Sequence, residues 1–243
     1  MSQNFILDGR HHLKHALLGL VTLATLSGCA KYPTNVEADA PRLIFKMTVE
    51  REINPNYVYV IPIHVTADLN PTGGPIPIID FPTTSTPVGF NGFVTGDVDY
   101  FVLWTPDTQQ YTLYKFNDSS LTFFTPIGIP LNTVNVTDGS NSIGFELSLT
   151  QIPGSTGDWK NLNTVQVNFM TMNYRLVPGK TAAGRVIDCL GNTKSFSELN
   201  TPFKFPLATS AVYDNARNFL EPSDDCDDPD LNITDWSVEV RRQ

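Results

Sequence analysis

Short stretches with a strict two-residue period constrain the fold of this 243-residue chain more than any other feature. Apolar side chains alternate with polar or small ones at 143–149, 165–169 and 236–240, and also at 43–49 apart from Ile44. In a β-strand successive side chains point to opposite faces, so this period is typical of strands with one buried face. Turn-rich segments separate the stretches, and the chain has 16 Gly and 18 Pro. The pattern predicts an all-β fold, an antiparallel β sandwich of the immunoglobulin or jelly-roll kind.

The predicted sandwich extends over residues 42–243 as a single domain, because no repeat or linker divides this part of the chain. A denser apolar run at 57–65 indicates a strand buried on both faces, and Pro62 within it indicates a sheet edge or a bulge. Residues 179–230 are irregular and acidic. We expect loops there, with one short helix near 210–219, so the C-terminal part of the domain is predicted to be loop-rich.

Residues 1–28 have the organisation of an export signal. Arg10 and Lys14 precede an apolar run at 16–26. A helix of this length spans about 16 Å, roughly half of a hydrocarbon core of about 30 Å, so it is too short to cross a membrane. The run ends in Leu26-Ser27-Gly28-Cys29, which resembles the lipobox of bacterial lipoproteins. A secretory signal with an incidental cysteine, or a buried N-terminal helix, are the alternatives.

The lipoprotein resemblance implies lipidation of Cys29. In that family the thiol receives diacylglycerol, the chain is cut before the cysteine, and the new amine takes an acyl chain such as palmitate. Residues 29–41 would then form a lipid-anchored tether, since they lack periodicity and contain two prolines. Ala30, in place of the aspartate that retains lipoproteins at the inner membrane of enteric bacteria, favours the outer membrane or cell surface.

The charge of the chain limits its partners. The formal net charge is −9, and an acidic surface repels phosphates, so nucleic acid is not expected as a partner. An acidic surface also gives no electrostatic help in binding anionic lipid. Membrane attachment is therefore expected to depend on lipid at Cys29.

The order of strand patterns resembles a known class of domains over residues 42–175. The segments that carry this resemblance are 53–57 (INPNY), 101–104 (FVLW), 111–116 (YTLYKF) and 143–149 (IGFELSL). They are similar to the β sandwiches of the DOMON and family 9 carbohydrate-binding type. The resemblance implies a domain for ligand binding or interaction rather than an enzyme, and it names no ligand.

The histidine inventory restricts catalysis. His11, His12 and His15 would leave with the export signal, so only His64 remains in the mature chain. No nucleophile elbow, HExxH, P-loop or GxGxxG motif is present. A site with several histidine ligands for zinc is thereby excluded. We interpret His64 as a structural residue within a strand and predict no catalytic residue and no enzyme activity.

Paired carboxylates need no sequence signature, so glycoside hydrolysis remains an alternative. Asp97, Asp99 and Glu146 are the candidates for it, since they lie in or beside predicted strands. Glu146 alternates with apolar residues and is therefore expected to face water.

A dense acidic cluster follows in the C-terminal segment. Calcium binds several oxygen ligands that a loop can wrap around it, so the cluster is a candidate calcium site, although its spacing differs from an EF-hand loop. A solvated acidic loop is the alternative, and otherwise no cofactor is expected. The candidate ligands are Asp224, Asp225, Asp227, Asp228 and Asp230.

Two cysteines remain after Cys29, and an exported chain meets an oxidising compartment. We therefore predict a disulfide between Cys189 and Cys226, with two thiols as the alternative.

Aromatic residues make up 11% of the chain and could form a stacking platform for sugar rings. Burial in the core is the alternative for aromatic residues in strands. The candidates are Tyr100, Trp104, Tyr111, Tyr114 and Trp159.

Three functions follow from these patterns, in decreasing order of support. The first is a lipid-anchored, non-catalytic envelope protein that binds a ligand, with carbohydrate as the first class to test. The second is a structural or accessory subunit of an envelope or extracellular assembly, with a protein partner. The third is a glycoside hydrolase.

Overall fold

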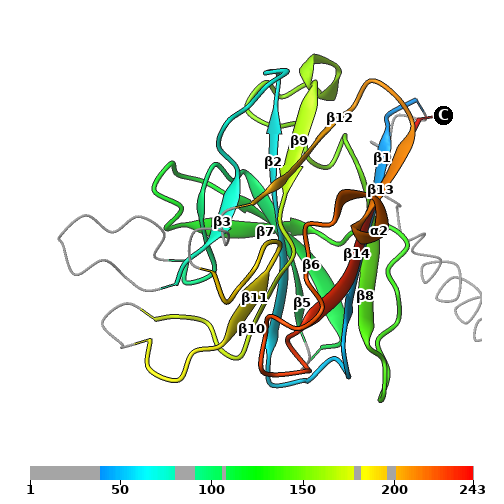
Figure 1. Ribbon diagram of the computed structural model, residues 1–243. Coiled ribbons are helices and arrows are strands. Elements are labelled where there is room, and N and C mark those ends of the chain that lie inside the picture. Colours follow the sequence, from blue (N-terminus) through cyan, green and yellow to red (C-terminus); the bar gives the residue numbers. More distant parts are fainter. Residues whose placement is uncertain (1–38, 80–90, 106–107, 178–181, 196–200, 243) are drawn as a thin grey trace, which may run out of the picture. The chain divides into compact units, whose positions relative to one another are not determined.

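The computed structural model is an antiparallel β sandwich, as the two-residue period predicts (Figure 1). It describes residues 39–79, 91–105, 108–177, 182–195 and 201–242, all within the unit Val36–Gln243. The predicted signal at 1–28, Cys29 and the tether up to residue 38 lie outside the described residues. No helix in the described part of the chain has the length and apolar character needed to cross a bilayer.

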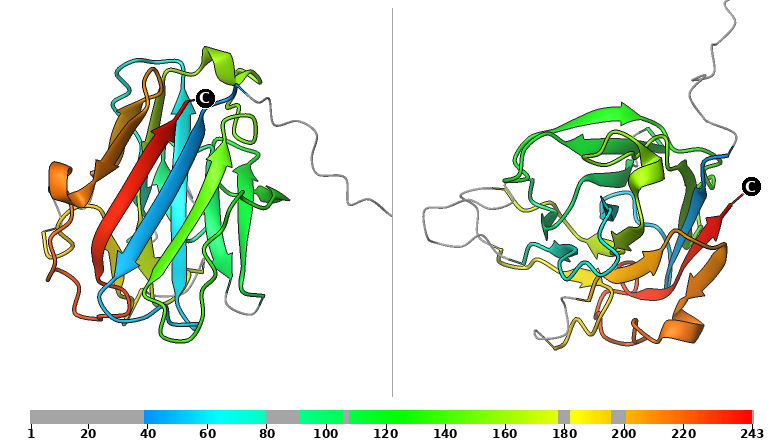
Figure 2. Two further views of the ribbon diagram at one scale, coloured as in Figure 1. Left: turned by 90° about the vertical axis from the view of Figure 1, so that its right-hand side faces the viewer. Right: turned by 90° about the horizontal axis from the view of Figure 1, so that it is seen from above.

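The smaller sheet has four strands in the order β13-β14-β1-β8. Its central pair, β1 and β14, joins the beginning of the domain to its end, with Arg42 opposite Arg241. Figure 2 shows β14, β1 and β8 side by side in front of the second sheet. The strands are β1 (Arg42–Val49), β8 (Ser142–Ser148), β13 (Ala211–Asp214) and β14 (Ile233–Arg241).

The larger sheet is built around β2, which pairs with β5 on one side and with β10 and β9 on the other. β7 forms one edge, and β12 extends the sheet beside β9. Its strands are β2 (Val58–Thr66), β5 (Tyr100–Thr105), β6 (Gln110–Phe116), β7 (Phe124–Gly128), β9 (Thr164–Val167), β10 (Met170–Met172), β11 (Ile187–Cys189) and β12 (Phe203–Pro206).

Pro62 lies in the middle of β2, so the expectation of a sheet edge at this residue is wrong. On one side of β2, pairing with β10 ends at Val60 and pairing with β9 begins at Ile63. Proline has no N–H to donate to a ladder. It fits at this position because the partner strand changes there, and Asn168 between β9 and β10 donates its backbone N–H to the Pro62 carbonyl.

Three short elements complete the described fold. β3 (Pro75–Pro77) and β4 (Val94–Gly96) form a small hairpin-like pair, and η1 (Trp159–Asn161) is a 3-10 turn. The helix expected near 210–219 is one turn, α2 (Asn215–Asn218), and it follows β13. Asp214 caps this turn by accepting a hydrogen bond from the Arg217 backbone N–H.

The main core fills the space between the two sheets. Alternate residues of β1, β8 and β14 point into it, including Phe45, Phe145 and Trp236, which are at most 2% exposed. They face Ile61 and other alternate residues of β2, β5 and β6. The hydrophobic effect thus selects the register of these strands, because a shift by one residue would turn their core side chains to the other face.

A second core lies on the outer face of the larger sheet. Phe101 packs there against Tyr114, Phe116 and Phe124, and the segment that carries Phe93 covers them. The two cores together explain the continuous apolar run of β2, because its side chains are buried on both faces.

Candidate functional site

A pocket of about 420 Å³ with several polar side chains in its lining opens where β2 and β6 end and β5 begins. Four segments line it: His64 of β2, residues 96–100 at the start of β5, residues 115–121 at the end of β6, and the loop at 154–155. Side chains far apart in the sequence meet there because β2 pairs with β5 and β5 pairs with β6.

His64 and Asp99 form the polar wall of this pocket. The distance from His64 Nδ1 to Asp99 Oδ2 is 2.8 Å, and the Val65 backbone N–H donates to the same oxygen at 2.9 Å. The Asp99 backbone is also held, since its N–H donates to the Ile63 carbonyl and its carbonyl accepts from Phe116. Both side chains are mostly covered, with 20% of His64 and 27% of Asp99 exposed. The pair is therefore well fixed in position.

The pKa of His64 is raised above its ordinary value of 6.5. Burial lowers this pKa, but the hydrogen bond to Asp99 and the charges of Asp99 and Asp97 together raise it by more. More of the imidazole is therefore protonated near neutral pH than in a free histidine, and the pair is then an ion pair.

The rim of the pocket carries side chains with hydrogen-bonding capacity. Asp97 is exposed and packs against Gly73, where a Cβ atom would overlap its carboxylate. Lys115, Asn117 and Ser155 are also exposed and line the same opening. The rim thus offers a carboxylate, an ammonium group, an amide and a hydroxyl to a small polar molecule.

Asp118 contributes to the shape of the pocket rather than to its chemistry. Its carboxylate accepts hydrogen bonds from the Ser120 hydroxyl and from the backbone N–H groups of Thr122 and Phe123. These bonds lower the pKa of Asp118. Because they hold the turn between β6 and β7, its oxygens are engaged within the protein.

A Ser-His-Asp arrangement is not assembled in the described residues. Ser119 and Ser155 line the pocket, but no hydroxyl among the described residues hydrogen-bonds to His64. The sequence interpretation placed His64 in a strand, which is confirmed, but it missed the pairing with Asp99. His64 and Asp99 meet because the register of β2 and β5 sets Ile63 opposite Tyr100. Finding this pair from the sequence would have required knowing that these two strands are neighbours.

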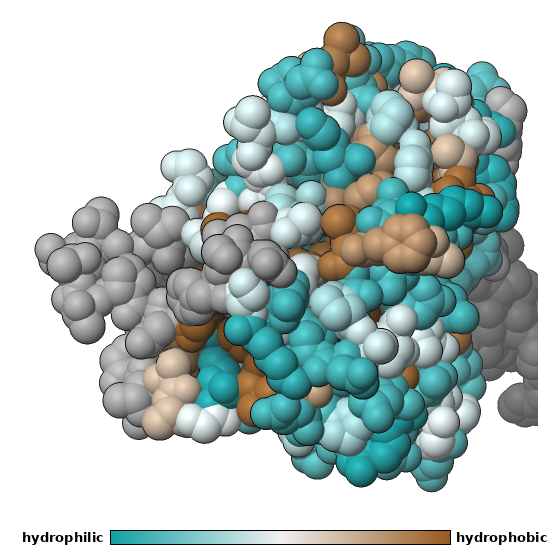
Figure 3. Space-filling model, viewed as in Figure 1, coloured by the Kyte–Doolittle hydropathy of each residue, from teal (hydrophilic) through white to brown (hydrophobic). Residues whose placement is uncertain are grey.

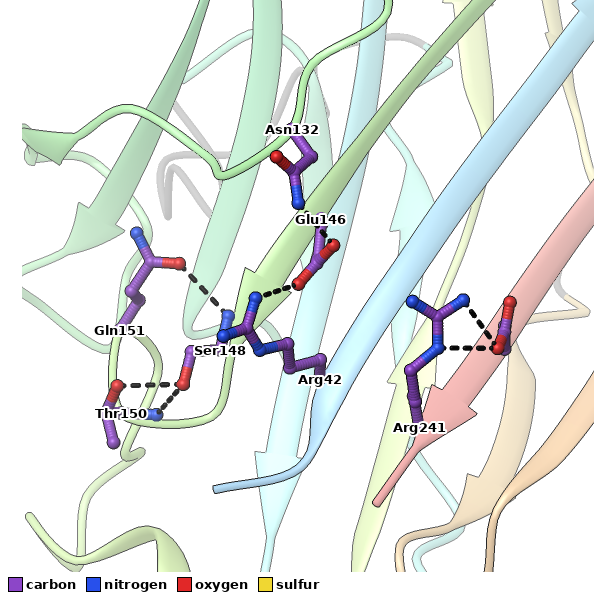
Figure 4. Close-up of polar contacts among 8 residues, drawn as sticks. Arg42, Asn132, Glu146, Ser148, Thr150, Gln151 and Arg241 are labelled. Carbon is purple, nitrogen blue, oxygen red and sulfur yellow. Dashed lines mark hydrogen bonds and ion pairs between the residues drawn. The ribbon is translucent and has the colours of Figure 1, made fainter. Parts of the chain in front are cut away.

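Of the three candidate carboxylates, Asp97 and Asp99 share this pocket and Glu146 does not. The expectation that Glu146 faces water is wrong, because it is only 5% exposed. Leu131 forms a bridge to it, so the preceding loop covers the outer face of β8. Glu146 Oε1 accepts from Arg42 at 2.6 Å and Oε2 accepts from Asn132 at 2.8 Å (Figure 4).

The Glu146 contacts are typical of a structural ion pair. Burial raises its pKa, but hydrogen bonds from Arg42 and Asn132 and the positive charge of Arg42 lower it by more. Neighbouring contacts fix the same edge, since the Ser148 backbone N–H donates to Gln151 and the Ser148 hydroxyl lies 2.9 Å from that of Thr150. Glu146 is therefore engaged on both carboxylate oxygens.

The aromatic residues proposed as a stacking platform do not form one. Three of them belong to the main core, where Tyr100 is 1% exposed and Trp104 and Tyr111 are each 4% exposed. Tyr114 stacks on Phe101 on the opposite face of the larger sheet. A side chain packed between two sheets has no face available for a sugar ring, so the platform is corrected to a set of core residues. The remaining candidate is Trp159, which is half-buried in η1 and packs against the main core.

The five aspartates proposed as a calcium cluster point to different partners, which corrects that assignment. Asp230 is bound by Arg51 at 2.7 Å and by Asn54. Asp228 accepts from the Tyr57 hydroxyl. The other three divide between the surface and the interior: Asp224 and Asp227 are exposed, and Asp225 is buried.

The predicted disulfide is not supported either. Cys189 and Cys226 are present as buried thiols, with no bond between them. Burial raises the pKa of both thiols, that of Cys226 to about 12.

The face of the molecule shown in Figure 3 is mainly hydrophilic, with scattered apolar patches.

Comparison of the chain with protein-family models, with curated proteins and with solved structures found no match.

Proposed function

We propose that this chain is a lipid-anchored, non-catalytic envelope protein that binds a small polar ligand in the pocket beside His64. Carbohydrate is the ligand class to test first. The observation that carries the proposal is the pocket lining, in which Asp97, Lys115 and Asn117 offer both donors and acceptors around one opening. Sugar hydroxyls donate and accept hydrogen bonds, so they match such a mixed rim.

Binding is favoured over catalysis because His64 and Asp99, the side chains of the pocket best suited to acid–base chemistry, are already hydrogen-bonded to each other. Asp99 accepts from His64 and from the Val65 backbone N–H, and no hydroxyl of a described residue is bonded to His64. A general base must lie within hydrogen-bond reach of the group that it deprotonates. The pair therefore serves best as a rigid wall that orients a ligand.

A glycan array probed with the full-length protein, followed by calorimetry with the best sugar, tests the binding proposal. Asn117→Ala and Asp97→Asn should each weaken binding by at least about tenfold, since each removes a polar contact from the rim. Asn135→Ala is the matched control, because Asn135 is exposed and lies outside the pocket lining. Equal loss in the control, or no binding by any sugar, would overturn the proposal for carbohydrate.

One observation favours the interaction alternative. β7 forms an edge of the larger sheet, and the segment around it exposes Phe123 (69%), Ile127 (44%) and Ile129 (67%). A sheet edge with apolar side chains is suited to strand addition by a protein partner. A partner that co-purifies from native membranes in stoichiometric amount with the wild type, and not with Ile129→Asp, would favour this function.

One observation favours the hydrolase alternative, namely the His64–Asp99 pair in a pocket that Ser155 also lines. The purified protein should nevertheless turn over neither glycan nor ester substrates. Turnover that His64→Ala abolishes, with the circular dichroism spectrum unchanged, would replace the binding proposal with a hydrolase.

The lipid anchor at Cys29 rests on its resemblance to the lipobox and has its own test. Cys29→Ser should leave the chain unprocessed or release it from membranes, because the acyl chains supply the membrane affinity. Mass spectrometry of the N-terminal peptide would identify the acyl groups, and palmitate is the expected chain. A Cys29→Ser protein that is still cut before residue 29 and stays membrane-bound would contradict the anchor.

A further inference from the structure

Three buried carboxylates from two separate segments of the chain meet in the folded domain. Asp188 belongs to β11, whereas Glu221 and Asp225 belong to the irregular segment between α2 and β14. One oxygen from each lies within 4.8 Å of the others. Asp188 is fully buried, and Glu221 and Asp225 are each 5% exposed. Of these three residues, only Asp225 belonged to the acidic cluster that the sequence suggested.

The hydrogen bonds of these carboxylates leave oxygens without partners. Asp188 is held on both oxygens by the backbone N–H groups of Cys189 and Ile233 and by the Thr193 hydroxyl. Asp225 accepts from the Thr193 backbone N–H through Oδ2, but its Oδ1 has no partner. Both oxygens of Glu221 are buried, and neither forms a hydrogen bond within the described part of the chain.

No positive side chain of the described residues neutralises this cluster. None of the Lys, Arg or His side chains in the described ranges forms an ion pair with any of the three carboxylates. The nearby Lys194 instead donates to the Asp224 carbonyl and lies 3.4 Å from the exposed Asp227. The cationic group therefore remains at the surface, while the interior holds the unpaired acids.

Buried like charges without partners are unfavourable, since each carboxylate has lost its water and faces the others. Burial first, and then the neighbouring carboxylates, raise the pKa of Glu221 to about 11 and that of Asp188 to about 7. A cation held between the oxygens would remove both causes, because it replaces the lost hydration and offsets the repulsion.

We propose that Asp188, Glu221 and Asp225 bind one calcium ion. The side chains that meet are oxygen donors only, which suits a hard cation rather than zinc or copper. Two features favour calcium over magnesium. Magnesium keeps several waters in strict octahedral geometry, whereas this cluster is buried, and calcium accepts irregular sets of carboxylate and carbonyl oxygens.

Bound calcium would join the segment before β14 to β11. Residues 219–232 have no helix or strand of their own, and two of the three ligands come from them. Holding this segment against the sheet lowers the number of conformations that it can adopt. The ion would thus cross-link this irregular segment to the larger sheet.

Calorimetry with calcium chloride on the full-length protein, stripped with EDTA and kept in detergent, tests the site. We expect one calcium per chain. At a calcium concentration about a hundredfold above Kd, the ratio of folded to unfolded protein should rise about a hundredfold, visible as a higher Tm than in EDTA. Absence of calcium binding, or equal binding of magnesium, would overturn the proposal.

Glu221→Gln locates the site, with Asp227→Asn as the matched control. Both substitutions remove one negative charge from the same acidic segment, but Asp227 is 92% exposed and lies outside the cluster. Glu221→Gln should weaken calcium binding at least about tenfold, because an amide cannot supply the negative charge that the ion needs. It should keep its β-sheet circular dichroism spectrum in EDTA, since the neutral amide has the same shape as the buried carboxyl. Asp227→Asn should bind like the wild type. Equal weakening in both variants would place the ion elsewhere.

If Glu221→Gln does not fold, Asp225→Asn provides the second variant, because Asp225 has only one oxygen without a partner. The stoichiometry of the wild type decides the proposal independently of either variant.

Discussion

Two buried acidic regions of this molecule solve the same electrostatic problem in different ways. Glu146 is 5% exposed and is bound on both oxygens, by Arg42 and by Asn132. Glu221 is equally buried, but among the described residues its oxygens accept no hydrogen bond and its neighbours are acids. The pKa of Glu146 is accordingly lowered, and that of Glu221 is raised. Burial alone therefore does not determine whether the pKa of a carboxylate is raised or lowered. The charge of the neighbouring side chains determines it.

The largest expected effect on stability comes from removing the arginine that pairs with Glu146. Arg42→Ala leaves Glu146 buried without its counter-charge and should lower the free energy of unfolding by about 2–3 kcal/mol. Arg241→Ala is the matched control, since Arg241 lies opposite Arg42 in the sheet but pairs with Glu239 at the surface (Figure 4). It should lose no more than about 0.5 kcal/mol. Urea denaturation measures both, and equal losses would contradict the prediction.

Replacing each of the two glutamates by glutamine should affect the free energy of unfolding differently. In calcium-free buffer at neutral pH, Glu146→Gln weakens two charge-assisted hydrogen bonds and should lower the free energy of unfolding by about 1–2 kcal/mol. Burial and the neighbouring carboxylates raise the pKa of Glu221 to about 11, so its carboxyl is already neutral at this pH, and Glu221→Gln should leave stability nearly unchanged. Urea denaturation in EDTA compares them directly. A large loss in Glu221→Gln would mean that this carboxylate has a partner of opposite charge.

Asp230 offers an intermediate case, because it is 4% exposed but its partner Arg51 is 62% exposed. The hydrogen bond from Arg51 is the largest cause that lowers the pKa of Asp230 below its ordinary 3.8. A lowered carboxyl pKa contributes stability above the unfolded value, and this contribution is lost as the pH falls through the folded value. Asp230→Asn should thus lower the free energy of unfolding at neutral pH. The loss should be smaller than that of Glu146→Gln. The difference should begin to shrink as the pH falls below 3.8 and should vanish below the lowered pKa of Asp230, as acid titration of both proteins can test.

The pocket pair is the weakest case, since Asp99 faces a cation only while His64 is protonated. The pKa of His64 is raised, so its contribution is complete below the unfolded value of 6.5 and is lost as the pH rises through the folded value. At low pH, His64→Gln should lower the free energy of unfolding by about 0.5–1 kcal/mol. The resulting difference in Tm from the wild type should shrink as the pH rises over that range. Melting curves between pH 5 and pH 9 decide this. A difference that does not change with pH would show that His64 contributes packing alone.

Much of the fold could be predicted because strand alternation is local. The period at 143–149 identifies β8, and the period at 236–240 identifies most of β14, since each needs only the neighbouring residues. The same local pattern failed for Glu146, because a residue on the outer face of a strand is exposed only if nothing covers it. The loop that covers β8 could not be placed from the pattern of β8 itself.

The candidate sites depended on contacts between distant residues. His64 and Asp99 are 35 positions apart, and Asp188 lies 33 and 37 positions before Glu221 and Asp225. The density of aspartates at 224–230 drew attention to neighbours in sequence. In the folded chain those side chains diverge, and only Asp225 turns inward to meet acids from other segments.

The sequence by itself determined the all-β class, the positions of most long strands and the presence of a single histidine, His64, after residue 15. Only the tertiary structure decided which acids are paired, which are left together and which aromatic residues are hidden. The physical reason is range. Alternation and hydrophobic burial act on each strand separately, whereas Arg42 and Glu146, 104 residues apart, meet only because β1 and β8 are neighbours in one sheet. The electrostatics of this protein therefore follows from the order of its strands.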